Sequence, residues 1–118
     1  MIGKMIGKTS ETELKKMYSD QVKDAAMRVL VGPEQGWESH VMRVIELGPN
    51  GYSPEHSHPW AHINYILEGE GFLMMSGEDT AVSAGSYAYV PGGTHHQFKN
   101  AADKPFKFIC IVSVEGHQ

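Results

Sequence analysis

Cysteine, long apolar runs and clustered basic residues are all scarce in this chain of 118 residues. The single cysteine, Cys110, has no second thiol in the chain to pair with, which excludes an internal disulfide. No stretch approaches the roughly 20 apolar residues that a membrane helix requires, so no membrane partner is expected. Basic residues form no run longer than Lys15-Lys16 and the formal charge is −4, which disfavours nucleic acid as a partner.

The first residues also lack a feature of secreted proteins. Lysines occur in Met1–Lys8 but no apolar segment follows them, so a secretory signal is not expected and the cytoplasm is the predicted location. Hydrophobic residues make up 41% of the chain and charged residues 20%, the balance of an ordinary soluble globular protein. A chain of this length is expected to form one domain with a single core.

Glycine and proline are frequent by contrast, with 13 and six copies that divide the chain into short segments. Thr9 to about Gln21 is predicted to be helical, because Ser10 and Glu13 have the spacing of a capping box. The other segments are rich in β-branched and aromatic residues, which predicts an all-β antiparallel sandwich or barrel. An N-terminal arm at residues 1–25, helical or extended, would precede a β-domain at residues 26–118. The predicted strands are Ala26–Val31, Val41–Leu47, His62–Leu67, Gly71–Met75, Thr80–Ser83, Ser86–Val90, His95–Phe98 and Phe106–Val114.

Four histidines have spacings that suit a metal ion. His56, His58 and His62 lie in one short stretch, and His96 lies much later in the chain. In a strand, His56 and His58 would point to the same side, and neutral imidazole is a common ligand for transition metals. A surface cluster of histidines that binds no metal is the alternative.

The segment around His96 resembles the second sequence motif of the cupin superfamily of small β-barrels. Five residues separate Gly85 from Pro91, one separates Pro91 from Gly93, two separate Gly93 from His96 and three separate His96 from Asn100. This agrees with the family pattern at every conserved position of that motif.

The earlier segment resembles the first cupin motif, with two departures. In the family, five residues usually separate a glycine from His-x-His, whereas here four separate Gly51 from His56. The family usually has glutamate where this chain has His62, and the motif glycine at position 69 is present. The resemblance implies a cupin double-stranded β-helix, or jelly-roll, barrel with a four-histidine metal site.

The resemblance also bears on the identity of the metal. Several single-domain cupins with four histidines carry manganese, so Mn²⁺ is favoured and Fe²⁺ comes second. Imidazole ligands also suit zinc, nickel and copper. Four neutral ligands leave the full +2 charge on a divalent ion, which should favour anionic ligands that chelate through oxygen.

Strand alternation suggests which residues line the barrel near the metal. Asn64 is a candidate for a polar contact to a metal ligand or substrate, or else a hydrogen-bonded core amide. Cys110 would be a pocket-lining thiol or a small buried hydrophobic residue. The candidate pocket residues are Asn64, Ile66, Phe98, Phe108 and Cys110.

Residues near the motifs invite further hypotheses. Trp60 would form the rim of the pocket or cover a subunit contact. Tyr87 and Tyr89 alternate in one strand and are expected in the barrel wall or the core. His95 has the opposite parity to His96, which places it at the surface or rim.

The function expected from these features is a metal-dependent small-molecule enzyme. An oxidoreductase or dioxygenase-type activity on a chelating, oxygen-rich or unsaturated substrate is the leading hypothesis. The alternatives are a non-redox decarboxylase or isomerase, and a non-catalytic module that binds a metal or a small ligand; fold alone does not choose among them. No catalytic residue is assigned, because no carboxylate is firmly placed inside the barrel. A barrel this small has exposed sheet edges, and the resemblance implies dimerisation, which is common among cupins. A homodimer is therefore predicted.

Overall fold

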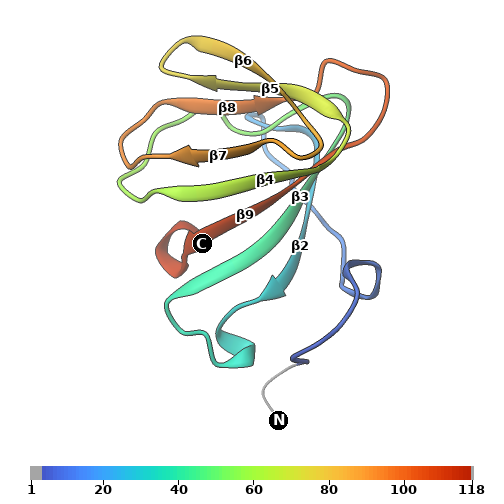
Figure 1. The fold of residues 1–118 in the computed structure, drawn as a ribbon, viewed down its shortest axis with the longest axis vertical. Helices are drawn as coiled ribbons and strands as arrows, with labels where there is room; N and C mark the ends of the chain where they lie inside the picture. Colours follow the sequence, from blue (N-terminus) through green and yellow to red (C-terminus); the bar gives the residue numbers. More distant parts are fainter. Residues whose placement is uncertain (1–3, 118) are drawn as a thin grey trace.

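The computed structural model describes residues 4–117, which form one nine-stranded sheet that curls into a barrel (Figure 1). Adjacent strands pair antiparallel, which confirms the predicted all-β class. The strands are β1 (Lys15–Lys16), β2 (Lys23–Val31), β3 (His40–Tyr52), β4 (His62–Glu68), β5 (Glu70–Met75), β6 (Glu78–Ser83), β7 (Tyr87–Val90), β8 (His96–Lys99) and β9 (Phe106–Ser113). Three short 3-10 helices accompany them: η1 (Thr9–Glu11), η2 (Pro33–Gln35) and η3 (Val114–His117).

The order of strands in the sheet explains how the barrel closes. The main path runs β6-β5-β8-β3-β9-β4-β7, with β2 on β3 and β1 on β2. Most of β3 pairs with β9, but its last residue, Tyr52, pairs with Lys99 of β8. The long strand β3 therefore belongs to both layers seen in Figure 1, the β5–β6–β8 layer and the layer that contains β9 and β4.

Alternation along the strands determines which side chains enter the barrel. In β9, every second residue from Phe106 to Val112 is buried, and the residues between them are half-buried. Side chains directly opposite each other in paired strands lie on the same face, so the partners of these β9 residues in β3 and β4 also point inward. The core cluster consists of Ala25, Ile45, Leu47, Ile66, Leu73, Val90, Phe98, Phe106, Phe108, Cys110 and Val112.

Two residues of the sequence motifs shape the barrel corners. Gly69, between β4 and β5, has φ +85°, and a Cβ there would lie 2.2 Å from the carbonyl oxygen of Pro105. Only glycine tolerates both conditions. Asn100 is buried, and its Nδ2 donates to the carbonyl oxygens of Leu47, Gly48 and Lys104. The motif asparagine thereby ties the β8–β9 connection to β3.

The helix predicted from Thr9 to Gln21 is wrong. Only η1 is helical there, and at its start the Lys8 amide donates to the Glu11 side chain at 3.0 Å, in place of the predicted pair Ser10 and Glu13. The chain then pairs as β1 with β2, in register Lys15↔Met27. An isolated short helix with few apolar contacts is marginal, whereas pairing with β2 satisfies the backbone at once. The arm is therefore extended.

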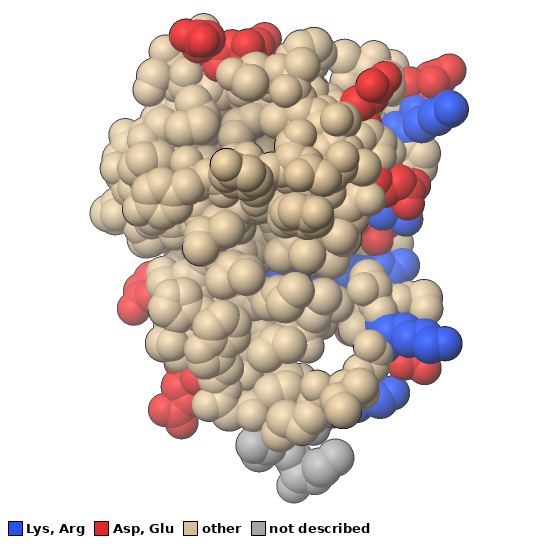
Figure 2. All heavy atoms as spheres, viewed as in Figure 1, with Lys and Arg blue, Asp and Glu red and all other residues tan. Residues whose placement is uncertain are grey.

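The outer face of β4 and β7 carries exposed aromatic residues. Tyr87 is 83% exposed and Tyr89 is 60% exposed, so their predicted placement in the wall or core is wrong. In β7 it is Val90 that is fully buried, which means that alternation there runs opposite to the expectation. Figure 2 shows this side of the molecule as a broad area without Lys, Arg, Asp or Glu. Within residues 4–117, no helix is long and apolar enough to cross a membrane.

Candidate metal centre

Four histidines converge from two segments distant in the sequence. His56 and His58 lie in the connection between β3 and β4, His62 is the first residue of β4, and His96 is the first residue of β8. The backbones of His56 and His96 form an isolated β-bridge, with N–H···O distances of 3.1 and 2.9 Å. Because this bridge continues the β3–β8 pairing past the end of β3, it brings the two motifs together.

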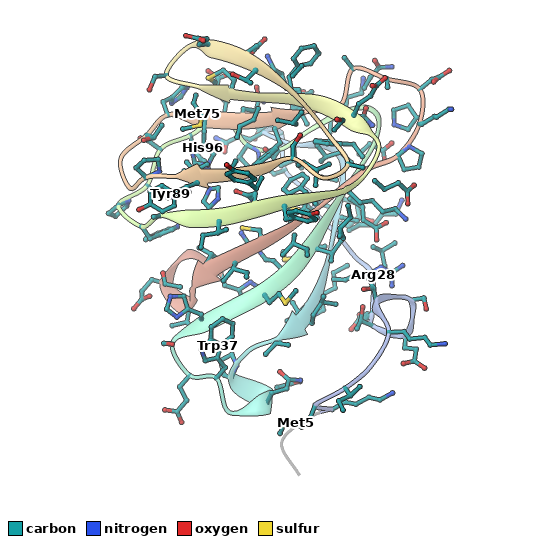
Figure 3. The ribbon with its side chains drawn as sticks, in the orientation of Figure 1. Met5, Arg28, Trp37, Met75, Tyr89 and His96 are labelled. Carbon is teal, nitrogen blue, oxygen red and sulfur yellow. The ribbon has the colours of Figure 1, made fainter. Side chains whose placement is uncertain are left out.

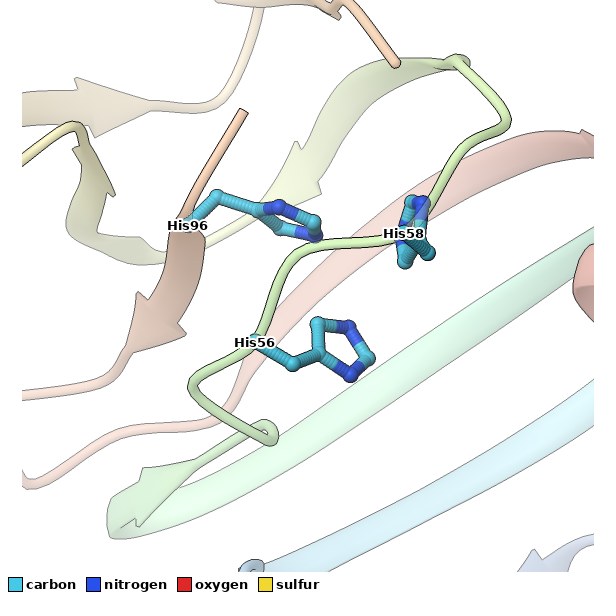
Figure 4. Close-up of side chains that lie close together, drawn as sticks. All are labelled: His56, His58 and His96. Carbon is cyan, nitrogen blue, oxygen red and sulfur yellow. The ribbon is translucent and has the colours of Figure 1, made fainter. Parts of the chain in front are cut away.

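Three of these side chains form a compact cluster that could hold a metal ion. One ligand atom from each of His56, His58 and His96 lies within 4.8 Å of the others (Figure 4). The His96 ring is 5.0 Å from the His56 ring and 4.9 Å from the His58 ring, centroid to centroid, and both contacts are edge-on. Three neutral imidazoles this close together can supply three ligand atoms to one ion.

The fourth histidine, His62, lies beside the cluster and is held by Asn64. Its Nδ1 is 2.6 Å from Asn64 Oδ1, and Asn64 Nδ2 donates to the carbonyl oxygen of Ile109 at 3.2 Å. The bond to Ile109 requires the amide NH₂ on that side, so the oxygen must face His62. His62 therefore carries its proton on Nδ1 and leaves Nε2 as a lone pair.

Backbone carbonyls hold two further histidines in the same tautomer. His58 Nδ1 donates to the carbonyl oxygen of Trp60 at 2.7 Å, and His96 Nδ1 donates to that of Thr94 at 2.8 Å. A carbonyl oxygen has no proton to give, so the ring nitrogen must supply it. The indole of Trp60 also stacks on the His58 ring at 5.0 Å and 12°. These contacts orient the rings as the outer hydrogen bonds of metal-binding histidines do.

The spacing of two free nitrogens suits a shared cation. Nε2 of His62 lies 3.2 Å from Nε2 of His96, and both atoms present lone pairs because their Nδ1 atoms face acceptors. Facing lone pairs repel unless a proton or a metal ion lies between them. Two nitrogens at about 2.1 Å from one ion are separated by about 3.0 Å at a right angle and about 3.4 Å in a tetrahedron. The observed separation falls between these values.

Loss of solvent around the ring atoms opposes protonation, even for His56, whose residue as a whole is exposed. Desolvation, the largest cause, and the charge of the neighbouring His96 together lower the pKa of His56 and of His62 to about 4. Desolvation likewise lowers the pKa of His96. The neutral form that donates to a metal is thus already the stable form at neutral pH.

The candidate pocket residues divide into two groups by their surroundings. Asn64 contacts His62, as described, and Cys110 lies opposite Asn64 in the β4–β9 register. Ile66, Phe98 and Phe108 pack in the apolar core, where the last two rings stack at 4.1 Å. All five are at most 4% exposed. Their contact with a substrate remains a prediction.

The neighbours of the cluster occupy different positions. His95 is at the surface, where it pairs with Glu55 at 2.9 Å, as its parity predicted. Figure 3 shows His96 at the same end of the barrel as Met75, its partner in the β5–β8 pairing. A separate cavity of about 900 Å³ lies between the N-terminal arm, β2 and η2, and none of the four histidines lines it.

Sequence reasoning missed Arg43 and His117. Arg43 Nη1 lies 3.2 Å from His117 Nδ1, and its guanidinium lowers the pKa of both His56 and His62 through its charge. The available signal was a charged residue at an inward position of β3, between Val41 and Ile45. His117 had no local signal, because η3 brings it to Arg43 only in the folded chain.

Comparison with known proteins places the chain in a family. Residues 43–112 match the cupin domain family, which is more than half of the chain, so the chain belongs to the cupins. It is 36% identical over 74 residues to 1-methylthio-D-xylulose 5-phosphate methylsulfurylase of Rhodospirillum rubrum, covering 63% of this chain and 47% of that protein. It is 28% identical over 64 residues to gentisate 1,2-dioxygenase of a Streptomyces species, covering 53% and 18% respectively.

A solved structure extends the similarity to almost the whole fold. The polyketide cyclase RemF of Streptomyces resistomycificus superposes with a TM-score of 0.87 at 24% identity, over 94% of this chain and 80% of that one. At this identity the similarity concerns the fold alone, and it agrees with the jelly-roll barrel expected from the motifs. The chain spans less than half of the length of the two curated relatives.

Proposed function

We propose that this cupin binds one divalent transition-metal ion through His56, His58, His62 and His96. We further propose that it acts as a small-molecule enzyme of oxidoreductase or dioxygenase type on a chelating, oxygen-rich or unsaturated substrate. The bound ion would supply open coordination positions and Lewis acidity or redox chemistry. A non-redox decarboxylase or isomerase would use the same residues without electron transfer.

The observation that supports the proposal most directly is the set of outer hydrogen bonds. Asn64, the Trp60 carbonyl and the Thr94 carbonyl each accept the Nδ1 proton of one histidine. As a result, three Nε2 lone pairs are presented without a proton. Three independent contacts that select the same tautomer favour a metal site over a cluster of surface histidines that binds no metal.

The residues around the proposed metal site orient the ligands and exclude water from one side of the site. Burial of His62 and His96, at 6% and 3% exposed, keeps solvent from one side of the site. His56 is exposed and His58 half-buried, so the opposite side faces the barrel mouth. A substrate would approach from that side, past the ring of Trp60 stacked on His58.

The metal we propose is manganese, with iron second. Both accept imidazole nitrogens, and four neutral ligands leave the full charge of a divalent ion to attract an anionic substrate. The preference for manganese comes from the resemblance to four-histidine cupins. Zinc, nickel and copper fit the same donor set, and the donors alone do not select among them.

Elemental analysis tests the proposal directly. Protein produced without a histidine tag and purified without chelators should contain about one metal ion per chain. Spectra of the bound metal should then change on addition of dioxygen together with oxygen-chelating acids. A redox-inert native metal would support the decarboxylase or isomerase, or a non-catalytic binding module. Absence of metal from protein that binds none on titration would refute all of these.

We also propose that the protein is a homodimer, with the outer face of β4 and β7 as the contact. Ile63, Tyr65, Tyr87 and Tyr89 are between 46% and 83% exposed there and pair across the two strands as Ile63↔Tyr89 and Tyr65↔Tyr87. Exposed contiguous apolar residues mark interaction surfaces, and a symmetric dimer would bury the patch against itself. Light scattering should give about twice the chain mass of 13.1 kDa, and Tyr87→Lys should restore the mass of a monomer. The cytoplasmic location and the division at residue 25 remain predictions from the sequence.

A further inference from the structure

Arg43 occupies an inward position of the barrel wall. It lies directly opposite Cys110 in the β3–β9 register, and Cys110 lies opposite Asn64 in the β9–β4 register. Opposed residues share a face, so Arg43, Cys110 and Asn64 form one row across the inner surface. The neighbouring inward positions of β3 are apolar: Val41, Ile45 and Leu47 are each at most 6% exposed.

The guanidinium in this row has only weak partners. Nη1 lies 3.2 Å from His117 Nδ1 and 3.8 Å from Met27 Sδ, and Nη2 lies 3.8 Å from Cys110 Sγ. Among residues 4–117, the buried Nε has no hydrogen-bond partner. In the part of the chain that the structure describes, no Asp or Glu forms an ion pair with Arg43.

A second arginine in the adjacent strand shows what a structural ion pair looks like in this fold. Arg28 donates from Nε to Glu46 at 2.8 Å and from Nη1 to the carbonyl oxygen of Thr12 at 2.6 Å. Arg43 has no comparable oxygen acceptor among the residues that the structure describes. Leaving a partly buried charge without an oxygen partner is costly, so folding alone gives no reason for an arginine at this position.

The position of Arg43 relative to the four histidines suggests a functional reason for an arginine at this position. Asn64, in the same row, holds His62 through its side-chain oxygen at 2.6 Å. The helix η3 also links Arg43 to the cluster: His117 meets Arg43, while a Cβ on Gly116 would lie 2.4 Å from Nε1 of Trp60, whose ring stacks on His58. The guanidinium therefore faces the same interior as the four histidines, with η3 beside it.

We propose that Arg43 binds a carboxylate of the substrate, and that the substrate is a carboxylic acid whose other oxygen atoms reach the metal. This rests on the proposed metal-dependent function. The planar guanidinium fork matches a carboxylate with two parallel N–H···O bonds, which no other side chain offers. The neutral imidazole of His117 is a weaker acceptor than a carboxylate oxygen, so the acid displaces it from Nη1 on binding.

The test uses the metal-loaded full chain and three probes of increasing length: oxalate, malonate and succinate. Calorimetric titration should show that Arg43→Met weakens the best-bound dicarboxylate by about 10- to 100-fold, the loss expected for hydrogen bonds to a charged group. Arg43→Lys should retain part of the affinity, because it keeps the charge but not the fork. Arg28→Met is the matched control and should bind all three acids like the wild type.

Two further measurements separate this proposal from a structural role and from failure of the metal site. Imidazole, a neutral metal ligand, should bind Arg43→Met and the wild type equally. Arg43→Met should also melt no lower than the wild type, because it removes a partly buried charge that has no oxygen partner. Wild-type affinity for every dicarboxylate in fully metallated Arg43→Met would overturn the proposal and leave the metal site intact. A wild-type chain that binds no metal would overturn the proposed function itself.

Discussion

Nε2 of His62 lies 3.2 Å from Nε2 of His96, and each ring donates a hydrogen bond from its Nδ1–H to an oxygen of the protein. The two lone pairs therefore face each other across a gap that neither ring can bridge with its own proton. One ring comes from the start of β4 and the other from the start of β8. The pairing of the two motifs thus produces a site that gains stability when a cation enters it.

Removal of His96 should empty the site, whereas removal of its neighbour should not. His96→Ala deletes the ligand contributed by the second motif, so most of the bound metal should be lost and the melting temperature should fall with it. His95→Ala removes only an exposed contact with Glu55 and should keep near-full metal content. Metal-to-protein ratios of the two variants, measured side by side, decide the matter. Loss of metal from His95→Ala alone would mean that the ligand had been assigned one residue too late.

Asn64 should matter for the orientation of His62. Asn64→Leu leaves the His62 Nδ1–H and the Ile109 carbonyl without their partner, which should cost about 1–3 kcal/mol for each buried polar group. Metal affinity should fall by about 10- to 100-fold, as for other outer contacts of metal ligands.

The isosteric variant Asn64→Asp separates these two effects. The carboxylate still accepts the Nδ1 proton of His62 but can no longer donate to Ile109, so stability should fall while metal binding is largely kept. Competition with a chelator and denaturant unfolding measure the two quantities. Equal loss of metal in both variants would show that the contact to His62 does not hold the ligand.

The charge of the ligand set should control the preference for anions. His62→Glu restores the usual cupin residue and adds one negative charge beside the ion, so metal should stay bound while oxalate binds more weakly. Calorimetry on fully metallated protein measures the change, with imidazole as the uncharged reference ligand. Unchanged oxalate affinity in a variant with full metal content would refute the electrostatic argument.

The metal-free protein should lose stability as the pH falls from about 7 to about 4. Desolvation and neighbouring charges lower the pKa of His56 and His62 from 6.5 to about 4, so between these values the unfolded chain binds more protons than the folded chain. Stability falls with decreasing pH wherever the unfolded state binds more protons, and these two groups cease to contribute to the slope below about 4. Urea unfolding at several pH values measures the slope. The double variant His56→Gln, His62→Gln should show a shallower slope, and an identical slope would contradict the assignment.

The sequence alone determined the local features of this protein. Strand positions followed from alternation and from turn residues, because both act over a few neighbouring residues. All eight predicted strands are present, and several of them are longer than predicted. The motif spacing also pointed to the three histidines that the structure gathers into a cluster, and to His62 beside them.

The errors and omissions concern contacts between distant parts of the chain. The sequence of Thr9–Gln21 is compatible with a helix, but within this segment β1 pairs with β2. Local propensity does not reveal this pairing, because β2 is a separate segment of the chain. Tyr87 and Tyr89 occupy alternate positions of one strand, so their side chains share one face of the sheet. Only the curl of the sheet decides that this face is the outer one. The meeting of Arg43 with His117 spans 74 residues. Such contacts depend on the register of the strands and on the closure of the barrel. The packing of the whole core sets both, and no short stretch of sequence contains that information.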